Sequence, residues 1–212
     1  MSNTMCRVQY TSGLYVDLFE KTVGVHFVKP VAPILVLNGN IGRPDKIQTY
    51  DFIKDCNKKW STVYYIPGKY ELENSNIGFM RYKYSGLHNV IILNNEARLH
   101  RPCGTLFLGT SNDMDWLKQW SKLISPVSGK IVALTHVSPS NTSTYIPFSA
   151  WICGDKIGGK KFNNTNNTLV AYNGRGRINC TNDFSGIDGW TRDASLIVPE
   201  IRGPEHRGPE LR

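Results

Sequence analysis

Short apolar runs, rich in Val, Ile, Leu and aromatic residues, alternate with polar turns along most of the chain. Their length and β-branched content are typical of strands, and they occur at residues 6–11, 34–37, 63–66, 90–93, 105–110, 131–136 and 168–172. Residues 44–60 and 116–123 instead carry apolar side chains at helical spacing. The first of these helices joins two of the strands, as in a βαβ unit. The pattern therefore predicts an α/β fold with parallel strands.

The strands at 34–37 and 63–66 both lead into turns that combine glycine with polar residues. The first continues through Gly39 and Asn40, and the second passes Gly68 into the polar run 69–71. Open α/β sheets place their functional sites beyond the carboxyl ends of the strands. We therefore expect these two loops to meet at one rim and to form part of a site.

Length and composition favour one globular domain followed by a short tail. The 212 residues are 40% hydrophobic, which suffices for a core, and we assign residues 1–200 to a single domain. Residues 201–212 repeat Arg-Gly-Pro-Glu twice and are predicted to be a flexible tail. No segment is apolar and long enough to span a membrane, and the first residues lack a secretory pattern. The expected location is therefore cytoplasmic or otherwise intracellular.

The five cysteines predict reduced thiols in the core. They are odd in number, dispersed and without a Cys-x-x-Cys spacing: Cys6, Cys56, Cys103, Cys153 and Cys180. Neither a zinc site nor a disulfide framework is favoured by this pattern in an intracellular chain.

The chain is basic, with a formal net charge of +8, and half of the excess lies in residues 154–177. A positive surface favours anionic partners, nucleic acid among them. No stacking platform or known nucleic-acid motif accompanies the charge. A solvated basic loop that only aids solubility explains the same residues.

Residues 154–161 also match the G-x-x-x-x-G-K pattern of phosphate-binding loops. That loop needs Ser or Thr after the lysine and a helix beyond it. Here Lys161 occupies the first of these positions, and the following residues are turn formers. Nucleotide hydrolysis by this segment is the minor alternative.

Taken in order, these motifs resemble the calcineurin-like metallophosphoesterase superfamily. The family's S-D-L-H, G-D and G-N-H-E motifs correspond here to residues 12–15, 39–40 and 68–71. Its T-H-H-A-P-S, W-I-H-G-H-T-H and N-P-R-G-Y motifs correspond to residues 135–140, 151–157 and 173–177. The resemblance covers residues 6 to about 187. It implies an α/β sandwich of two mixed β-sheets flanked by helices, with a shortened helical cover, because only fourteen residues separate His136 from Trp151.

The resemblance also implies that most of the family's metal ligands have been replaced. The seven ligand positions are Gly13, Tyr15, Asn40, Lys69, His136, Asp155 and Ile157, and the family's catalytic histidine corresponds to Tyr70. Two-metal hydrolysis needs carboxylate and imidazole groups around two close cations. One histidine, one carboxylate and one amide do not form that set, so the resemblance implies a pseudoenzyme without metal or other cofactor, in which His136 and Tyr70 are vestigial.

The remaining basic residues of the motifs suggest what such a pocket could bind. We expect Lys69, Lys156 and Arg175 to attract an anion, beside Asn173 of the former N-P-R-G-Y turn. Arg175 could equally be a structural residue paired within the fold. A protein partner or a second copy of the chain is expected as well, and a viral origin, with a place in a virion, is a hypothesis based on the reduced motifs. The alternative activity is residual hydrolysis with His136 as acid or base and one metal or none.

Overall fold

The computed structural model of the protein describes residues 5–19, 28–123, 130–138, 148–163, 168–175 and 194–198. The first sheet has the order β10 (Ser195–Ile197), β1 (Arg7–Thr11), β2 (Ile34–Asn38), β3 (Thr62–Ile66), β4 (Val90–Ile92). The second sheet has the order β5 (Glu96–His100), β6 (Thr105–Thr110), β7 (Lys130–Thr135), β8 (Ala150–Asn163), β9 (Leu169–Gly174). The helices are α1 (Ile47–Lys59), α2 (Lys69–Asn74), α3 (Ile77–Lys83) and α4 (Met114–Leu123), with short 3-10 turns η1 (Val16–Leu18) and η3 (Arg101–Cys103).

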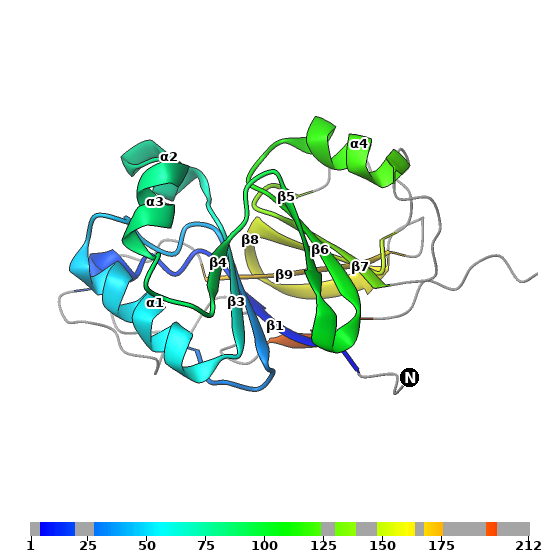
Figure 1. The fold of residues 1–212 in the computed structure, drawn as a ribbon, viewed down its shortest axis with the longest axis horizontal. Coiled ribbons are helices and arrows are strands. Elements are labelled where there is room, and N and C mark those ends of the chain that lie inside the picture. Colours follow the sequence, from blue (N-terminus) through cyan, green and yellow to red (C-terminus); the bar gives the residue numbers. More distant parts are fainter. Residues whose placement is uncertain are drawn as a thin grey trace, which may run out of the picture.

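The two sheets pack face to face, and helices cover their outer faces (Figure 1). One apolar cluster lies between the first sheet and α1 and α3, and includes Leu35, Phe52 and Met80. A second cluster fills the space between the sheets, where Val36 and Phe107 pack. A third lies between the second sheet and α4. This layered arrangement confirms the predicted α/β sandwich of two mixed sheets flanked by helices.

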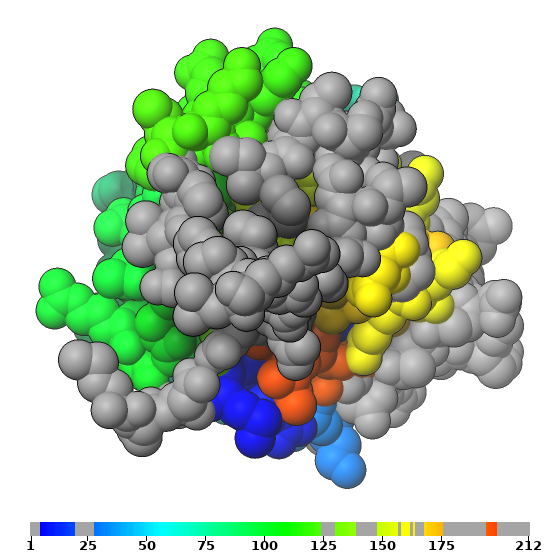
Figure 2. Space-filling view, turned by 90° about the vertical axis from the view of Figure 1, so that its right-hand side faces the viewer, coloured from blue at the N-terminus to red at the C-terminus, as the bar shows by residue number. Residues whose placement is uncertain are grey.

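Most strands run in parallel, which brings their carboxyl ends to one side of the sandwich. Strands β1 to β4 run parallel to one another, and so do β6, β7 and the first part of β8. Strands β10 and β5 are antiparallel at the sheet edges, so both sheets are mixed. In Figure 2, β10 (orange) lies beside the start of β1 (blue) on the same face as the yellow β8 segment.

Strand β8 borders β9 twice. Its first residues run parallel to β9, from Ala150 opposite Leu169 to Cys153 opposite Tyr172. After Gly158, whose φ is +89°, the strand pairs with β9 in the opposite direction, until residue 163 lies opposite residue 169. The second half of β8 therefore returns along the other edge of β9. Residues 154–161 all lie in this strand, so they do not form the loop before a helix that the phosphate-binding pattern requires.

Other differences from the predicted elements have local causes. Helix α1 begins at Ile47 rather than 44, after a turn in which the Lys46 N–H donates to the Arg43 carbonyl. Helix α2 was not predicted, since its sequence KYELEN has no apolar stripe and its buried residue is Glu71. Strand β10 has three residues, too few for a clear alternation. The RGPE tail lies outside the described residues. No helix in the described ranges has the length and apolar character needed to cross a membrane.

Candidate functional site

Glycines allow the loops after β2, β3 and β7 to approach one another and the middle of β8 closely. Gly39 has a φ of +82°, and a Cβ there would lie 2.4 Å from His136 Nδ1 and 2.8 Å from Gly68 Cα. A Cβ on Gly154 would lie 1.7 Å from the Asn38 carbonyl oxygen. The tips of the two sheets are therefore in direct backbone contact, and the predicted rim is where they meet.

The Glu71 carboxylate organises this rim. It is fully buried, and its Oε2 accepts hydrogen bonds of 2.8 Å from the N–H groups of Asn40 and Gly68. Its Oε1 accepts from the Ile41 N–H at 2.5 Å and from the Tyr65 hydroxyl at 3.0 Å. Burial and the negative charge of Glu71 hold the pKa of Tyr65 well above its ordinary value. Glu71 therefore acts as a structural anchor for the loop after β2, a role that the sequence did not reveal.

The side chain of Asn40 is engaged within the protein. Its backbone has a φ of +54°, a conformation that Asn tolerates better than most residues. Its Oδ1 accepts a hydrogen bond of 3.0 Å from the Tyr70 N–H at the start of α2. Asn40 therefore joins the loops after β2 and β3. The neighbouring Gly13, with a φ of +62°, donates its N–H to the Gly39 carbonyl at 2.9 Å and joins the loop after β1 to them.

Two tyrosines occupy one side of the rim. Tyr15 has a left-handed backbone, with φ and ψ both 49°, which is strained for an aromatic residue. Its ring meets the edge of the Tyr70 ring, with centroids 5.0 Å apart. The Tyr70 hydroxyl donates a hydrogen bond of 2.8 Å to Asp17 Oδ2. Asp17 was not predicted as a site residue, because it lies beyond residues 12–15, the first motif of the resemblance.

His136 is buried at the end of β7 and lies in the wall of a pocket of about 460 Å³. Its Nδ1 is 3.2 Å from the Asn38 carbonyl oxygen. A carbonyl only accepts hydrogen bonds, so Nδ1 carries the proton and Nε2 is an acceptor in the neutral ring. The pocket is lined by Lys69, Leu72, Glu73, Ser111, Asn112, His136, Val137 and Asp155.

The charged residues of this pocket already have partners of opposite charge or polar character. The Lys69 ammonium is 3.6 Å from Glu73 Oε1, in a pair whose side chains are 79% and 58% exposed. Such exposed pairs contribute at most about 1 kcal/mol, so Lys69 can turn to a ligand at little cost. The Ser138 hydroxyl donates to Asp155 Oδ1, and neither Lys69 nor Lys156 forms an ion pair with Asp155 among the described residues.

Of the three cations predicted to bind an anion, only Lys69 lines the His136 pocket. Arg175 is 1% exposed, donates from Nη1 to the Leu14 carbonyl at 3.0 Å, and lies over the Phe19 ring at 4.8 Å. Burial lowers the pKa of its guanidinium. Lys156 is exposed, and its carbonyl lies close to Gly174. The joint anion site of these three residues stays a prediction, and the geometry favours Lys69 for it.

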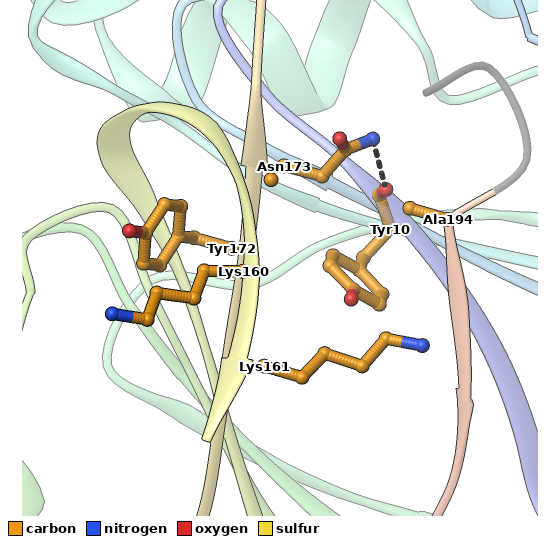
Figure 3. Close-up of a pocket in the computed structure, with 7 residues that line it drawn as sticks. Tyr10, Lys160, Lys161, Tyr172, Asn173 and Ala194 are labelled. Atoms are coloured by element: carbon orange, nitrogen blue, oxygen red, sulfur yellow. Dashed lines mark hydrogen bonds between the residues drawn. The ribbon is translucent and has the colours of Figure 1, made fainter. Parts of the chain in front are cut away.

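Asn173 lies in a second pocket, of about 330 Å³, between β1, β8, β9 and the residue before β10 (Figure 3). The side-chain Nδ2 of Asn173 donates to the Tyr10 carbonyl at 3.3 Å. The backbone carbonyl of Asn173 accepts from the Ser12 N–H at 3.0 Å. Lys160 and Tyr172 lie on one side of β8 and β9, and Lys161 and Tyr10 lie on the other side (Figure 3). The Lys161 ammonium donates to the Ser195 carbonyl. Asn173 therefore holds β9 against β1. The backbone of Ile157, the last family ligand position, pairs with Gly174.

Several pocket residues escaped the sequence analysis. Ser111 and Asn112 follow β6, whose carboxyl end faces the same rim, so strand order was the available signal. Glu73 had no signal, since α2 was not predicted. Within the part of the chain that the structure describes, no three His, Cys, Asp or Glu side chains gather as a metal-binding group.

Neither protein-family profiles nor curated protein sequences match the chain. Among solved structures, the fold is similar to the crystal structure of a phosphopantetheinyl hydrolase from Mycobacterium tuberculosis. The two share 9% identity and a TM-score of 0.58, over 82% of this chain and 90% of that one. A second crystal structure shares 13% identity and a TM-score of 0.57, over 81% and 91% of the two chains. At such identities the likeness shows the fold, which is that of a phosphoesterase-like sandwich.

Proposed function

We propose that the protein is a pseudoenzyme, a metallophosphoesterase-like scaffold that acts by binding and holds no catalytic metal pair. The observation that carries the proposal is the hydrogen bond from the Tyr70 N–H to Asn40 Oδ1. The resemblance assigns a metal-bridging oxygen to this position. Here that oxygen belongs to a neutral amide, and one of its two lone pairs already accepts a hydrogen bond from the protein backbone.

The other donors at the family's ligand positions fit a metal pair no better. Gly13 has no side chain, the Tyr15 ring packs against Tyr70, and Lys69 brings a positive charge. His136 and Asp155 remain, and the latter accepts from Ser138. One imidazole and one carboxylate supply too few ligands for two divalent cations.

In this proposal the ligand of the His136 pocket is a small anion such as a phosphate group, which Lys69 must bind against the charges of the Glu73 and Asp155 carboxylates in the same lining. Lys69 supplies an exposed ammonium, and Ser111 and Asn112 supply polar side chains from the loop after β6. The Lys69–Glu73 pair is exposed and exchangeable, so an anion of higher charge density can take over the ammonium.

Thermal unfolding with phosphate tests this assignment against a chloride control of equal ionic strength. At about ten times the dissociation constant, mass action stabilises the fold by about 1.4 kcal/mol and raises Tm by about 3–5 °C. Lys69→Gln should abolish the shift. Lys54→Gln changes an exposed lysine of α1 that does not line the pocket, so it is the matched control and should retain the shift. A shift that survives in both variants, or no shift in the unmodified protein, contradicts binding at this pocket.

A second candidate, metal-free hydrolysis by His136, is supported by one observation. The Asn38 carbonyl fixes the imidazole so that Nε2 is free of the proton and can accept one. His136→Ala should remove any such activity, while Lys69→Gln should reduce binding alone.

A further inference from the structure

The His136 pocket carries charges of both signs, with carboxylates in excess. Lys69 contributes one ammonium, and Glu73 and Asp155 contribute two carboxylates. Lys69 and Glu73 lie on α2, which follows β3 of the first sheet, and they pair with each other at 3.6 Å. Asp155 lies in β8 of the second sheet and forms no ion pair among the described residues. The pocket therefore offers a negative charge on the side opposite to its only ammonium.

The groups beside Asp155 accept hydrogen bonds. His136 Nδ1 donates to the Asn38 carbonyl, so Nε2 is the ring nitrogen that is left to accept one. Asp155 Oδ1 accepts from the Ser138 hydroxyl, and a carboxylate has about four acceptor sites in all. A ligand group that binds at this end must therefore supply N–H or O–H donors, and the carboxylate favours a donor that is positively charged.

We propose that the His136 pocket binds a small zwitterion, with a phosphate group at Lys69 and a primary ammonium at Asp155. This inference rests on the proposed anion binding at Lys69 and specifies the class of ligand. A bare anion that takes over Lys69 leaves two carboxylates uncompensated in the same lining and is repelled by both. A zwitterion replaces the charge that it takes, because its own ammonium pairs with a carboxylate.

The dimensions and walls of the pocket suit such a ligand. Its volume is about 460 Å³, which is within the ordinary range for sites that bind small molecules. Leu72 and Val137 supply apolar surface for the methylene groups between the two charged ends. A primary ammonium is preferred to a quaternary one, because only the former has N–H groups to donate to Asp155 and His136 Nε2.

Isothermal titration calorimetry with three phosphomonoesters tests the proposal on the full chain. Phosphoethanolamine carries the primary ammonium, ethyl phosphate lacks it, and phosphocholine carries a cation without N–H donors. Phosphoethanolamine should bind about tenfold more tightly than ethyl phosphate, since it adds charge-assisted hydrogen bonds. Phosphocholine should rank between them, because it gains only the attraction between opposite charges.

Substitutions separate the two ends of the ligand. Asp155→Asn keeps an oxygen that accepts from Ser138 but removes the charge, so the preference for phosphoethanolamine should fall to about twofold. Lys69→Gln should weaken the binding of all three compounds. Asp115→Asn changes an exposed aspartate of α4 that does not line the pocket, so it is the matched control and should keep the tenfold preference.

The outcomes distinguish this inference from the anion binding on which it rests. Equal affinities of the unmodified chain for phosphoethanolamine and ethyl phosphate would overturn the zwitterion and leave anion binding intact. A preference that persists undiminished in Asp155→Asn would overturn the assignment of the ammonium to that carboxylate. Phosphocholine that binds as tightly as phosphoethanolamine would overturn the role of the N–H donors. Failure of all three compounds to bind would contradict the proposed anion binding itself, and the zwitterion with it.

Discussion

The Tyr70 hydroxyl donates a hydrogen bond of 2.8 Å to Asp17 Oδ2, across 53 positions of sequence. Asp17 Oδ1 is buried and has no hydrogen-bond partner among the described residues. Tyr70, which the resemblance places at a catalytic histidine position, therefore donates to one oxygen of a half-buried carboxylate, and its hydroxyl is occupied in the folded protein.

The first prediction concerns this pair. Tyr70→Phe removes the donor and leaves the Asp17 carboxylate without its described partner, so the free energy of unfolding should fall by about 1–3 kcal/mol. Urea unfolding measures the change. The control Tyr82→Phe alters a tyrosine that is 81% exposed and should be neutral. Equal stability of the two variants would show that the hydrogen bond contributes nothing.

The second prediction concerns the anchoring role of Glu71. Glu71→Gln replaces a carboxylate that accepts from three backbone N–H groups within 2.8 Å, and it points amide hydrogens at some of them. We expect a loss of about 3 kcal/mol in the free energy of unfolding. Glu73→Gln changes the same residue type on the same helix, but in an exposed ion pair, and should cost less than about 1 kcal/mol. Similar losses in both variants would refute the anchor.

The third prediction concerns alkaline pH. Burial raises the pKa values of Tyr10, Tyr64, Tyr65 and Tyr84 above their ordinary value of 10.0. The folded state keeps these protons while the unfolded state loses them, so the stability they contribute is complete below pH 10 and declines as the pH rises further. Each such tyrosine adds up to about 1.4 kcal/mol per pH unit to the decline.

Phenolate absorbance during alkaline titration checks this behaviour. The four buried tyrosines should ionise together with unfolding, after the more exposed ones. Ionisation of every tyrosine near pH 10.0 with the fold intact, seen by circular dichroism, would contradict the burial of these hydroxyls.

The sequence was sufficient to predict the strands that form the middle of both sheets. Ile34–Asn38 and Lys130–Thr135 are buried along their whole length, so an apolar run identifies them. Helix α2 could not be predicted in this way, since its fold-determining residue is a buried glutamate whose donors come from another loop.

Long-range pairs limited the prediction of the site. The positions of His136, Asn40 and Lys69 at one rim followed from strand order. The pairing of Tyr70 with Asp17 and the burial of Arg175 against Phe19 depend on how loops and sheets pack. No spacing rule within one segment contains that information.

Metal analysis of the purified protein, followed by a phosphodiester hydrolysis assay with added divalent cations, tests the pseudoenzyme proposal most directly. Asn40 Oδ1 already accepts from the Tyr70 N–H, and only His136 and Asp155 supply an imidazole and a carboxylate at the positions that the resemblance assigns to metal ligands. The account predicts less than stoichiometric manganese, zinc or iron, and no metal-dependent hydrolysis in the unmodified chain or in Lys69→Asn. Stoichiometric metal, with metal-dependent hydrolysis that disappears in His136→Ala, would contradict it.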